Sequence, residues 1–150
     1  MRHLILGSSG QIGAHLVDYL QNNGEQVIEY DLEYKEWQDL REAYNPTLES
    51  YIDTCDIVHF LAFDVGGAKY LEENQDKHQF ITNNMRIMIN TFALLKSYNK
   101  PFIFASSQMA EMGYSSYGML KALGEKITRD LDGLVVKFWN VYGFETDPKK

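Results

Sequence analysis

The sequence contains one cysteine, three prolines and four histidines, and it has no long hydrophobic run. A single cysteine, Cys55, excludes an internal disulfide and a zinc site built from cysteine pairs. The histidines are scattered without the spacing of metal ligands, so we expect no metal. Basic residues number 14 against 21 acidic ones, and the net charge of −7 argues against nucleic acid or an anionic membrane as a partner.

The sequence also lacks the features of membrane-spanning and secretory segments. No apolar run approaches the roughly 18 residues of a membrane span, since even residues 57–63 are interrupted by His59. The first apolar run follows Met1-Arg2-His3 directly, which is too abrupt for a signal peptide. With a hydrophobic content of 45% and a charged content of 23%, we expect one soluble cytoplasmic domain over residues 1–150.

Short apolar runs alternate along the chain with longer amphipathic segments. The runs predict strands at residues 3–6, 26–30, 34–38, 56–62, 101–105 and 134–138. Helical spacing predicts helices at residues 11–22, 39–51, 81–95 and 116–131, with Pro46 expected to break or kink the second. Strands that alternate with helix-length crossovers predict an α/β fold, a doubly wound parallel sheet of about six strands with helices on both faces.

A glycine-rich turn, Gly7-Ser8-Ser9-Gly10-Gln11-Ile12-Gly13, lies between the first predicted strand and the first predicted helix. In a dinucleotide site, one glycine makes the tight turn, one lets the backbone approach the pyrophosphate and one lets the helix pack on the strand. The helix N-terminus then offers free N–H groups to the phosphates. The position of this turn favours nucleotide binding, and the alternative is a plain Gly/Ser turn.

Asp31 closes the second predicted strand, 18 residues after Gly13. A carboxylate at that position can accept hydrogen bonds from the adenosine ribose hydroxyls, and it would repel a 2′-phosphate. No arginine follows it within the same turn, which favours NAD over NADP as cofactor. The alternative is an aspartate that caps a turn at the end of a strand.

Tyr117 and Lys121 lie four residues apart, so both project from one face of the last predicted helix. A nearby ammonium lowers the pKa of a tyrosine toward working pH and makes it a usable acid or base. Ser106-Ser107 ends the preceding strand, where one hydroxyl can bridge a substrate oxygen and the tyrosine. The alternatives are a surface tyrosine beside a solvated lysine and serines that only cap a strand end or helix.

Six motifs occur in an order that resembles the extended short-chain dehydrogenase/reductases, in the NAD-dependent epimerase/dehydratase family that acts on nucleotide sugars. They are Gly7-x-x-Gly10-x-x-Gly13, Asp31, Asp39-Leu40, Ser106-Ser107, Tyr117-x-x-x-Lys121 and Asn140-Val141-Tyr142-Gly143. The resemblance covers essentially the whole chain. It implies a Rossmann fold, NAD as cofactor and a nucleotide sugar as substrate.

The resemblance also implies a role for individual residues. The catalytic set would be Ser107, Tyr117 and Lys121, with a tyrosine base and hydride transfer between a sugar carbon and NAD. Lys121 would also bind the nicotinamide ribose, while Ser107 and Asn140 would contact the substrate. The remaining cofactor contacts would come from Gly7, Gly10, Gln11, Ile12, Gly13, Asp31, Asp39, Leu40, Leu61, Ala62, Asn84 and Phe138.

Two departures from the family pattern leave other functions open. Only nine residues separate Ser107 from Tyr117, where the family has some two dozen, and the sequence stops after the asparagine motif. We therefore expect that this chain does not contain the C-terminal substrate domain of the family. We also expect that a homodimer, or the missing C-terminal domain, completes the site. The alternatives are a non-catalytic NAD-binding module that pairs with a partner, and a reductase of a smaller carbonyl substrate.

Overall fold

The computed structural model describes residues 1–142, so Gly143 of the asparagine motif lies outside the described residues. Five strands alternate with five α-helices and one short 3-10 helix. In chain order they are β1 (Arg2–Leu6), α1 (Gln11–Asn22), β2 (Gln26–Tyr30), α2 (Pro46–Thr54), β3 (Ile57–Phe60), α3 (Ala68–Asn74), α4 (His78–Ser97), β4 (Phe102–Ser107), η1 (Gln108–Glu111), α5 (Ser116–Asp130) and β5 (Leu134–Phe138).

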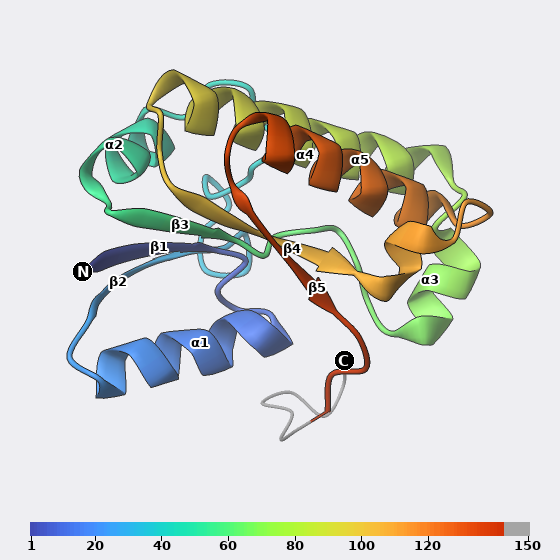
Figure 1. Ribbon diagram of the computed structural model, residues 1–150, viewed down its shortest axis with the longest axis horizontal. Coiled ribbons are helices and arrows are strands. Elements are labelled where there is room, and N and C mark those ends of the chain that lie inside the picture. The colour runs from blue at the N-terminus through green and yellow to red at the C-terminus, as the bar shows by residue number, and fades with distance from the viewer. Residues whose placement is uncertain (143–150) are drawn as a thin grey trace.

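The strands form one parallel sheet in the order β2-β1-β3-β4-β5 (Figure 1). The chain moves outward from β1 to β2 on one side and then returns to build β3, β4 and β5 on the other. The strand order therefore reverses between β1 and β3, and doubly wound sheets bind ligands at such a point, beyond the carboxyl ends of the strands. Both strands end near this point, β1 at Leu6 and β3 at Phe60.

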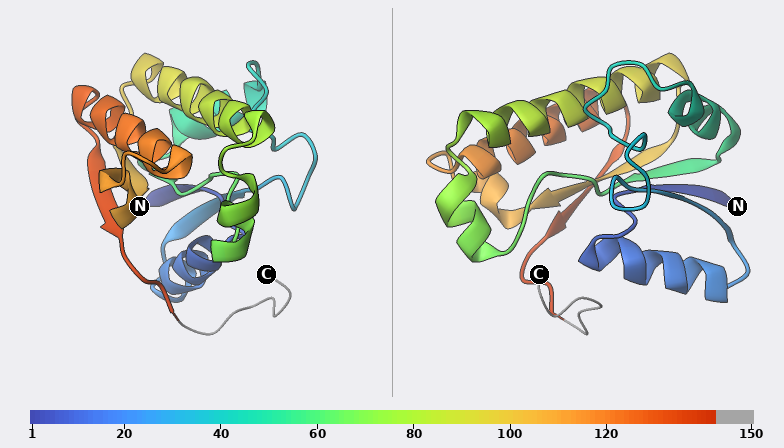
Figure 2. Two further views of the ribbon diagram at one scale, coloured as in Figure 1. Left: turned by 90° about the vertical axis from the view of Figure 1, so that its right-hand side faces the viewer. Right: turned by 180° about the vertical axis from the view of Figure 1, so that it is seen from behind.

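Helices cover both faces of the sheet, as expected. Figure 2 shows α1 on one side of the sheet and α4 and α5 on the other. The larger hydrophobic cluster lies on the second side, where Phe60 makes edge contacts with Phe92 and Phe104 at centroid distances of 5.3 and 5.4 Å. The smaller cluster packs Ile5 against Val17 and Leu20 of α1. Burial of these apolar side chains supplies the main driving force for folding.

The predicted strand at residues 34–38 was wrong, because these residues form turns, and the sheet has five strands where about six were expected. Side-chain hydrogen bonds hold this segment against the end of β2, where Gln38 Oε1 accepts from the backbone N–H of Asp31 at 2.9 Å. The backbone N–H of Tyr34 likewise donates to the carbonyl of Asp31 at 3.1 Å. The segment therefore folds over the carboxyl edge of the sheet and does not extend it.

The predicted helix over residues 39–51 was also wrong in its start and in the role of its proline. Helix α2 begins at Pro46, because proline is favoured in the first turn, where its missing N–H has no partner to lose. Asn45 caps the helix by accepting from the backbone N–H of Leu48 at 3.0 Å. Within residues 1–142, no helix is long and apolar enough to cross a membrane.

Candidate functional site

The glycine turn after β1 contains two glycines that the fold requires and one that it does not. Gly7 has a φ of +89°, and a β-carbon there would lie 2.7 Å from the backbone nitrogen of Ala62. A β-carbon on Gly13 would lie 2.1 Å from the carbonyl oxygen of Gly7. On Gly10 the nearest heavy atom would be 3.4 Å away, which is an ordinary contact. The space beside Gly10 is therefore free for a ligand that approaches the backbone closely.

Helix α1 begins at this turn without a side-chain cap. Its N-cap is Gly10, which has no side chain that could accept from the first N–H groups of the helix. The first turn carries no acidic residue either. The backbone N–H of Ala14 donates to the Gly10 carbonyl at 2.9 Å and starts the helical ladder. Free N–H groups and the positive end of the helix dipole therefore face outward from the turn, which suits a phosphate group.

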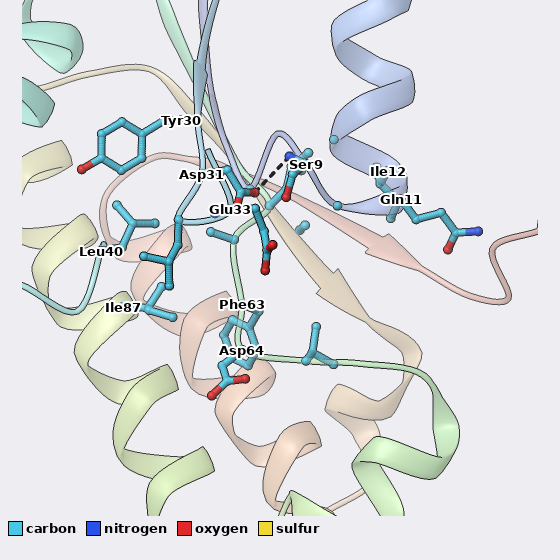
Figure 3. Close-up of a pocket in the computed structure, with 18 of the residues that line it drawn as sticks. Ser9, Gln11, Ile12, Tyr30, Asp31, Glu33, Leu40, Phe63, Asp64 and Ile87 are labelled. Atoms are coloured by element: carbon cyan, nitrogen blue, oxygen red, sulfur yellow. Dashed lines mark hydrogen bonds between the residues drawn. The ribbon is translucent and has the colours of Figure 1, made fainter. Parts of the chain in front are cut away.

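A cavity of about 810 Å³ opens beside the turn, at the point where the strand order reverses (Figure 3). Ten of the residues predicted to contact a cofactor line it. They are Gly7, Gly10, Gln11, Ile12, Gly13, Asp31, Asp39, Leu40, Leu61 and Ala62. These residues come from separate stretches of the chain, which the fold brings to one edge of the sheet. A dinucleotide fits this lining, because the cavity combines backbone N–H groups, an acidic strand end and apolar walls.

Asp31 is held directly against the glycine turn. Its carboxylate accepts from the backbone N–H of Ser9 at 2.9 Å (Figure 3). It also accepts from the backbone N–H of Glu33 at 3.0 Å. Each carboxylate oxygen has two lone pairs, so both oxygens keep capacity to accept from a ribose hydroxyl. Asp31 therefore lies beside the glycine turn with capacity left to accept, and its role at the adenosine ribose stays a prediction.

Arg41 is a functional candidate that sequence reasoning missed. Its guanidinium forms a bidentate pair with Asp39, with an Nε–Oδ1 distance of 2.8 Å and an Nη2–Oδ2 distance of 2.6 Å. The hydrogen bond from Arg41 holds the pKa of Asp39 below its usual value. Both residues line the same cavity as Asp31, so an arginine is present there although none follows Asp31 in its own turn.

The two serines at the end of β4 have different surroundings. Ser106 is buried and donates to Glu125 Oε1 at 2.6 Å, which explains it as a structural residue. Ser107 caps η1 by accepting from the backbone N–H of Met109 at 3.2 Å. The Ser107 hydroxyl also opposes the rise in the pKa of Tyr117, which places it near the phenol. Ser107, and not Ser106, therefore lies beside the tyrosine.

The short connection between Ser107 and Tyr117 is compact. Helix η1 packs directly on the first turn of α5, where a β-carbon on Gly118 would lie 2.1 Å from the carbonyl oxygen of Met109. Ser115 caps α5 by accepting from Gly118 N–H at 3.0 Å, and its hydroxyl donates to Gln75 Oε1 at 2.7 Å. Nine residues are therefore enough to bring the serine and the tyrosine together.

Lys121 is buried, with 3% of its surface exposed, and its ammonium donates to the carbonyl of Ala105 at 2.8 Å. Burial lowers the pKa of Lys121 to about 7. Burial also raises the pKa of Tyr117, and the hydrogen bond with Ser107 only opposes that shift. The pKa of Tyr117 is therefore raised and not lowered as expected, because desolvation dominates at the tyrosine and burial also disfavours the charge of Lys121.

Asn84 supports the site from α4 without lining the cavity. It is fully buried, accepts from the backbone N–H of Asp64 at 2.7 Å and donates to the carbonyl of the same residue at 3.0 Å. The Asp64 carboxylate in turn accepts from Tyr70 at 2.9 Å and from Asn83 at 2.8 Å. This set of bonds fixes the loop that follows β3, which forms one wall of the cavity.

Phe138 and Asn140 lie apart from the main cavity. They line a second, smaller hollow of about 370 Å³, which they share with Gln11 and Ile12 at the start of α1. The fold therefore brings the end of β5 close to the glycine turn. Among residues 1–142, no group of three or more His, Cys, Asp or Glu side chains is arranged to hold a metal ion.

Three solved structures with the same fold are named as enzymes of sugar nucleotides. The UDP-glucose 4-epimerase of Thermotoga maritima, solved with UDP-glucose, is 22% identical with a TM-score of 0.76 over 100% of this chain and 59% of that one. A GDP-D-glycero-L-gluco-heptose synthase of Campylobacter jejuni, solved with NADPH, is 19% identical with a TM-score of 0.78 over 97% and 49%. The dTDP-4-dehydrorhamnose reductase of Bacillus anthracis, in complex with NADP, is 16% identical with a TM-score of 0.77 over 97% and 56%.

The chain therefore spans about half the length of these structures. No curated protein sequence matches it significantly. The sequence model of the NAD dependent epimerase/dehydratase family, by contrast, matches residues 3–150, which is nearly the whole chain. That match, together with the five-stranded parallel sheet and the glycine turn at its point of reversal, shows that the chain belongs to the NAD-dependent epimerase/dehydratase family.

Proposed function

We propose that this chain binds NAD in the cavity beside the glycine turn and carries the catalytic residues of a nucleotide-sugar epimerase, dehydratase or reductase. The observation that carries the proposal is the convergence of ten predicted cofactor residues on one cavity. Gly10 and the first N–H groups of α1 would hold the pyrophosphate, and Asp31 would accept from the adenosine ribose. Asp39 and Leu40 would border the adenine.

The nicotinamide, when bound, would exchange a hydride with a sugar carbon. The residues of this chain would manage the proton and the orientation. Tyr117 would take the proton from the sugar hydroxyl, and Ser107 would donate a hydrogen bond to the same oxygen. Lys121 would bind the nicotinamide ribose and stabilise the tyrosinate. The nucleotide sugar itself is proposed from the family and from the substrates named for the similar structures.

A second candidate is a non-catalytic module that binds NAD and pairs with a partner chain. One observation favours it: Ser107, Tyr117 and Lys121 do not line the cavity that would hold the cofactor, and Lys121 is almost fully buried. The two candidates share the binding site and differ in turnover. Incubation with NAD and a panel of UDP-, GDP- and dTDP-sugars, followed for NADH and for epimerised or dehydrated product, separates them.

Calorimetric titration tests the binding proposal itself. The wild-type chain is expected to bind both NAD and ADP, because ADP carries the pyrophosphate that the turn would hold. Gly10→Ala is expected to weaken the affinities for NAD and ADP by at least about tenfold, since its β-carbon would occupy the space needed by the phosphates. Gly113→Ala, on the connection before α5 where a β-carbon would meet nothing within 4 Å, is the matched control and should leave both affinities unchanged. Failure of the wild-type chain to bind either ligand would overturn the proposal.

A further inference from the structure

The aromatic ring of Phe63 lies between the cavity and the predicted catalytic residues. On one side it lines the cavity below the glycine turn (Figure 3). On the other side its ring centroid is 3.7 Å from the ammonium of Lys121 and 5.8 Å from the ring of Tyr117, in an edge-on arrangement. A ligand that approaches the buried Lys121 from the cavity therefore meets this ring first.

The backbone beside Phe63 is held in place, which identifies the part of the loop that can move. Asp64 is bonded to Asn84 through both its backbone N–H and its carbonyl, and its carboxylate is bonded to Tyr70 and Asn83. These contacts fix the main chain one residue along. Phe63 itself is only partly buried, and no polar atom of its side chain ties it down. Rotation of the side chain, rather than displacement of the whole loop, is the motion that the packing permits.

The closed position also gives the buried lysine a partner. The ammonium of Lys121 has three donors, of which one bonds the Ala105 carbonyl, and the face of the Phe63 ring lies over the cation. A ligand that brings hydroxyl oxygens to the ammonium can replace the ring with hydrogen bonds. Opening would therefore be coupled to the arrival of a hydroxyl-bearing group and not to occupation of the cavity alone.

We propose that Phe63 gates the site: its closed form accepts the adenosine diphosphate end of a dinucleotide, and its displacement admits the remaining half to Tyr117 and Lys121. This inference rests on the proposed cofactor-binding function. It assigns Phe63 a specificity role, because only a ligand with a second ribose beyond the pyrophosphate gains from opening. Such a ligand binds with an apparent affinity reduced by the fraction of molecules that are open.

Removal of the ring should separate the two halves of the ligand. In Phe63→Ala, the Kd for NAD is expected to fall about tenfold, the gain if roughly a tenth of the wild-type molecules are open, while the Kd for ADP stays within about twofold. Val65→Ala is the matched control, since Val65 lines the same cavity two residues further along the loop. It should change the NAD and ADP affinities alike. Equal changes for NAD and ADP in Phe63→Ala, or no change, would overturn the gate.

A second measurement keeps the test valid if Phe63→Ala fails to fold. With 4-fluorophenylalanine placed at position 63 of the otherwise unchanged chain, the ¹⁹F resonance reports the surroundings of the ring. NAD is expected to move the resonance and ADP to leave it nearly in place. The same resonance position with both ligands would contradict the gate. Absence of ADP binding would instead contradict the proposed function, so the two failures can be told apart.

Discussion

The glycine turn and the serine–tyrosine–lysine cluster, which we propose act together, are built in opposite ways. At the turn, the functional groups belong to the backbone and face an open cavity, with the start of α1 left uncapped by any side chain. In the cluster, they belong to side chains: Lys121 is buried and bonded to the Ala105 carbonyl, whereas Ser107 and Tyr117 are partly buried. The comparison teaches that the proposed binding half is preformed, whereas in the proposed chemical half Lys121 is closed off by the Phe63 ring.

This contrast predicts that substitutions in the cluster act on turnover and leave binding intact. The largest effect is expected for Tyr117→Phe, which removes the proton-transfer group and should lower turnover of the complete enzyme about 10²- to 10⁴-fold. NAD affinity and thermal stability should be nearly unchanged. Tyr114→Phe, on the exposed connection before α5, is the matched control. Equal turnover by Tyr117→Phe and wild type would return Tyr117 to a packing role.

The burial of Lys121 should make stability depend on pH. Its pKa is about 7 in the folded chain, against about 10.4 when unfolded. Between these values the unfolded chain binds more protons, so the free energy of unfolding rises with pH, by up to about 1.4 kcal/mol per unit from pH 7 to 10. Below pH 7 the charged lysine is buried at full cost.

Lys121→Met isolates this contribution. Its unfolding by urea, measured beside the wild type at pH 7, 8, 9 and 10, removes the effect of every other titrating group by subtraction. Loss of the hydrogen bond to Ala105 adds an offset that does not change with pH. The free energy of unfolding of the wild type minus that of Lys121→Met should increase as pH rises. Parallel curves would mean that the folded lysine keeps its ordinary pKa.

At the glycine turn, by contrast, we expect substitution of Gly13 to affect mainly stability and substitution of Gly10 to affect mainly NAD binding. Gly13→Ala places a β-carbon 2.1 Å from the Gly7 carbonyl and is expected to cost about 3 kcal/mol, because backbone on both sides must shift. In Gly10→Ala the added β-carbon meets only an ordinary contact, so the free energy of unfolding should fall by less than about 1 kcal/mol. The same substitution should still weaken the binding of NAD. Urea unfolding of both variants checks the order. Equal losses would show that the fold, and not a ligand, requires Gly10.

The sequence was sufficient for the elements whose pattern is local. The strands Gln26–Tyr30 and Leu134–Phe138 lie where the apolar runs predicted them, and helix α1 begins at the predicted Gln11. The glycine turn was also recognisable, because strand, turn and helix follow one another without interruption. Local periodicity failed at residues 34–38, where the hydrogen bonds of Asp31 with Gln38 and Tyr34 decide the backbone path.

The parts of the site that depend on tertiary contacts could not be foreseen. Phe63 reads as the end of an apolar run, and nothing in the sequence indicates that its ring lies over Lys121, 58 residues later. Arg41 was missed because it is ten residues from Asp31 in the chain, although both line one cavity. The burial of Lys121 could not be predicted either, since a lysine four residues from a tyrosine is usually exposed. Burial, and not spacing, reverses the expected effect on the tyrosine pKa.

A further prediction concerns the preference of the cavity beside the glycine turn, the preformed half, for NAD over NADP. Two of the similar structures contain NADP or NADPH, so the preference must be argued from the residues of this chain. Asp31, Glu33, Asp39 and Asp64 all line the cavity, and the one arginine there, Arg41, is already paired with Asp39. A 2′-phosphate near Asp31 would meet carboxylates and no free cation, so NAD should bind on the order of a hundredfold more tightly than NADP.

Release of Arg41 sharpens this prediction. In Asp39→Asn the carboxylate charge is lost, and the guanidinium becomes available to a phosphate that it can bind with paired hydrogen bonds. The preference for NAD should then narrow by about tenfold, mainly through tighter NADP. Asp39→Asn/Arg41→Met is the control that removes the released cation and should restore most of the preference. Fluorescence titration with both cofactors measures each ratio. If the wild-type chain binds NADP as tightly as NAD, then Asp31 does not face the 2′ position, and the carboxylates of the preformed half do not select the cofactor.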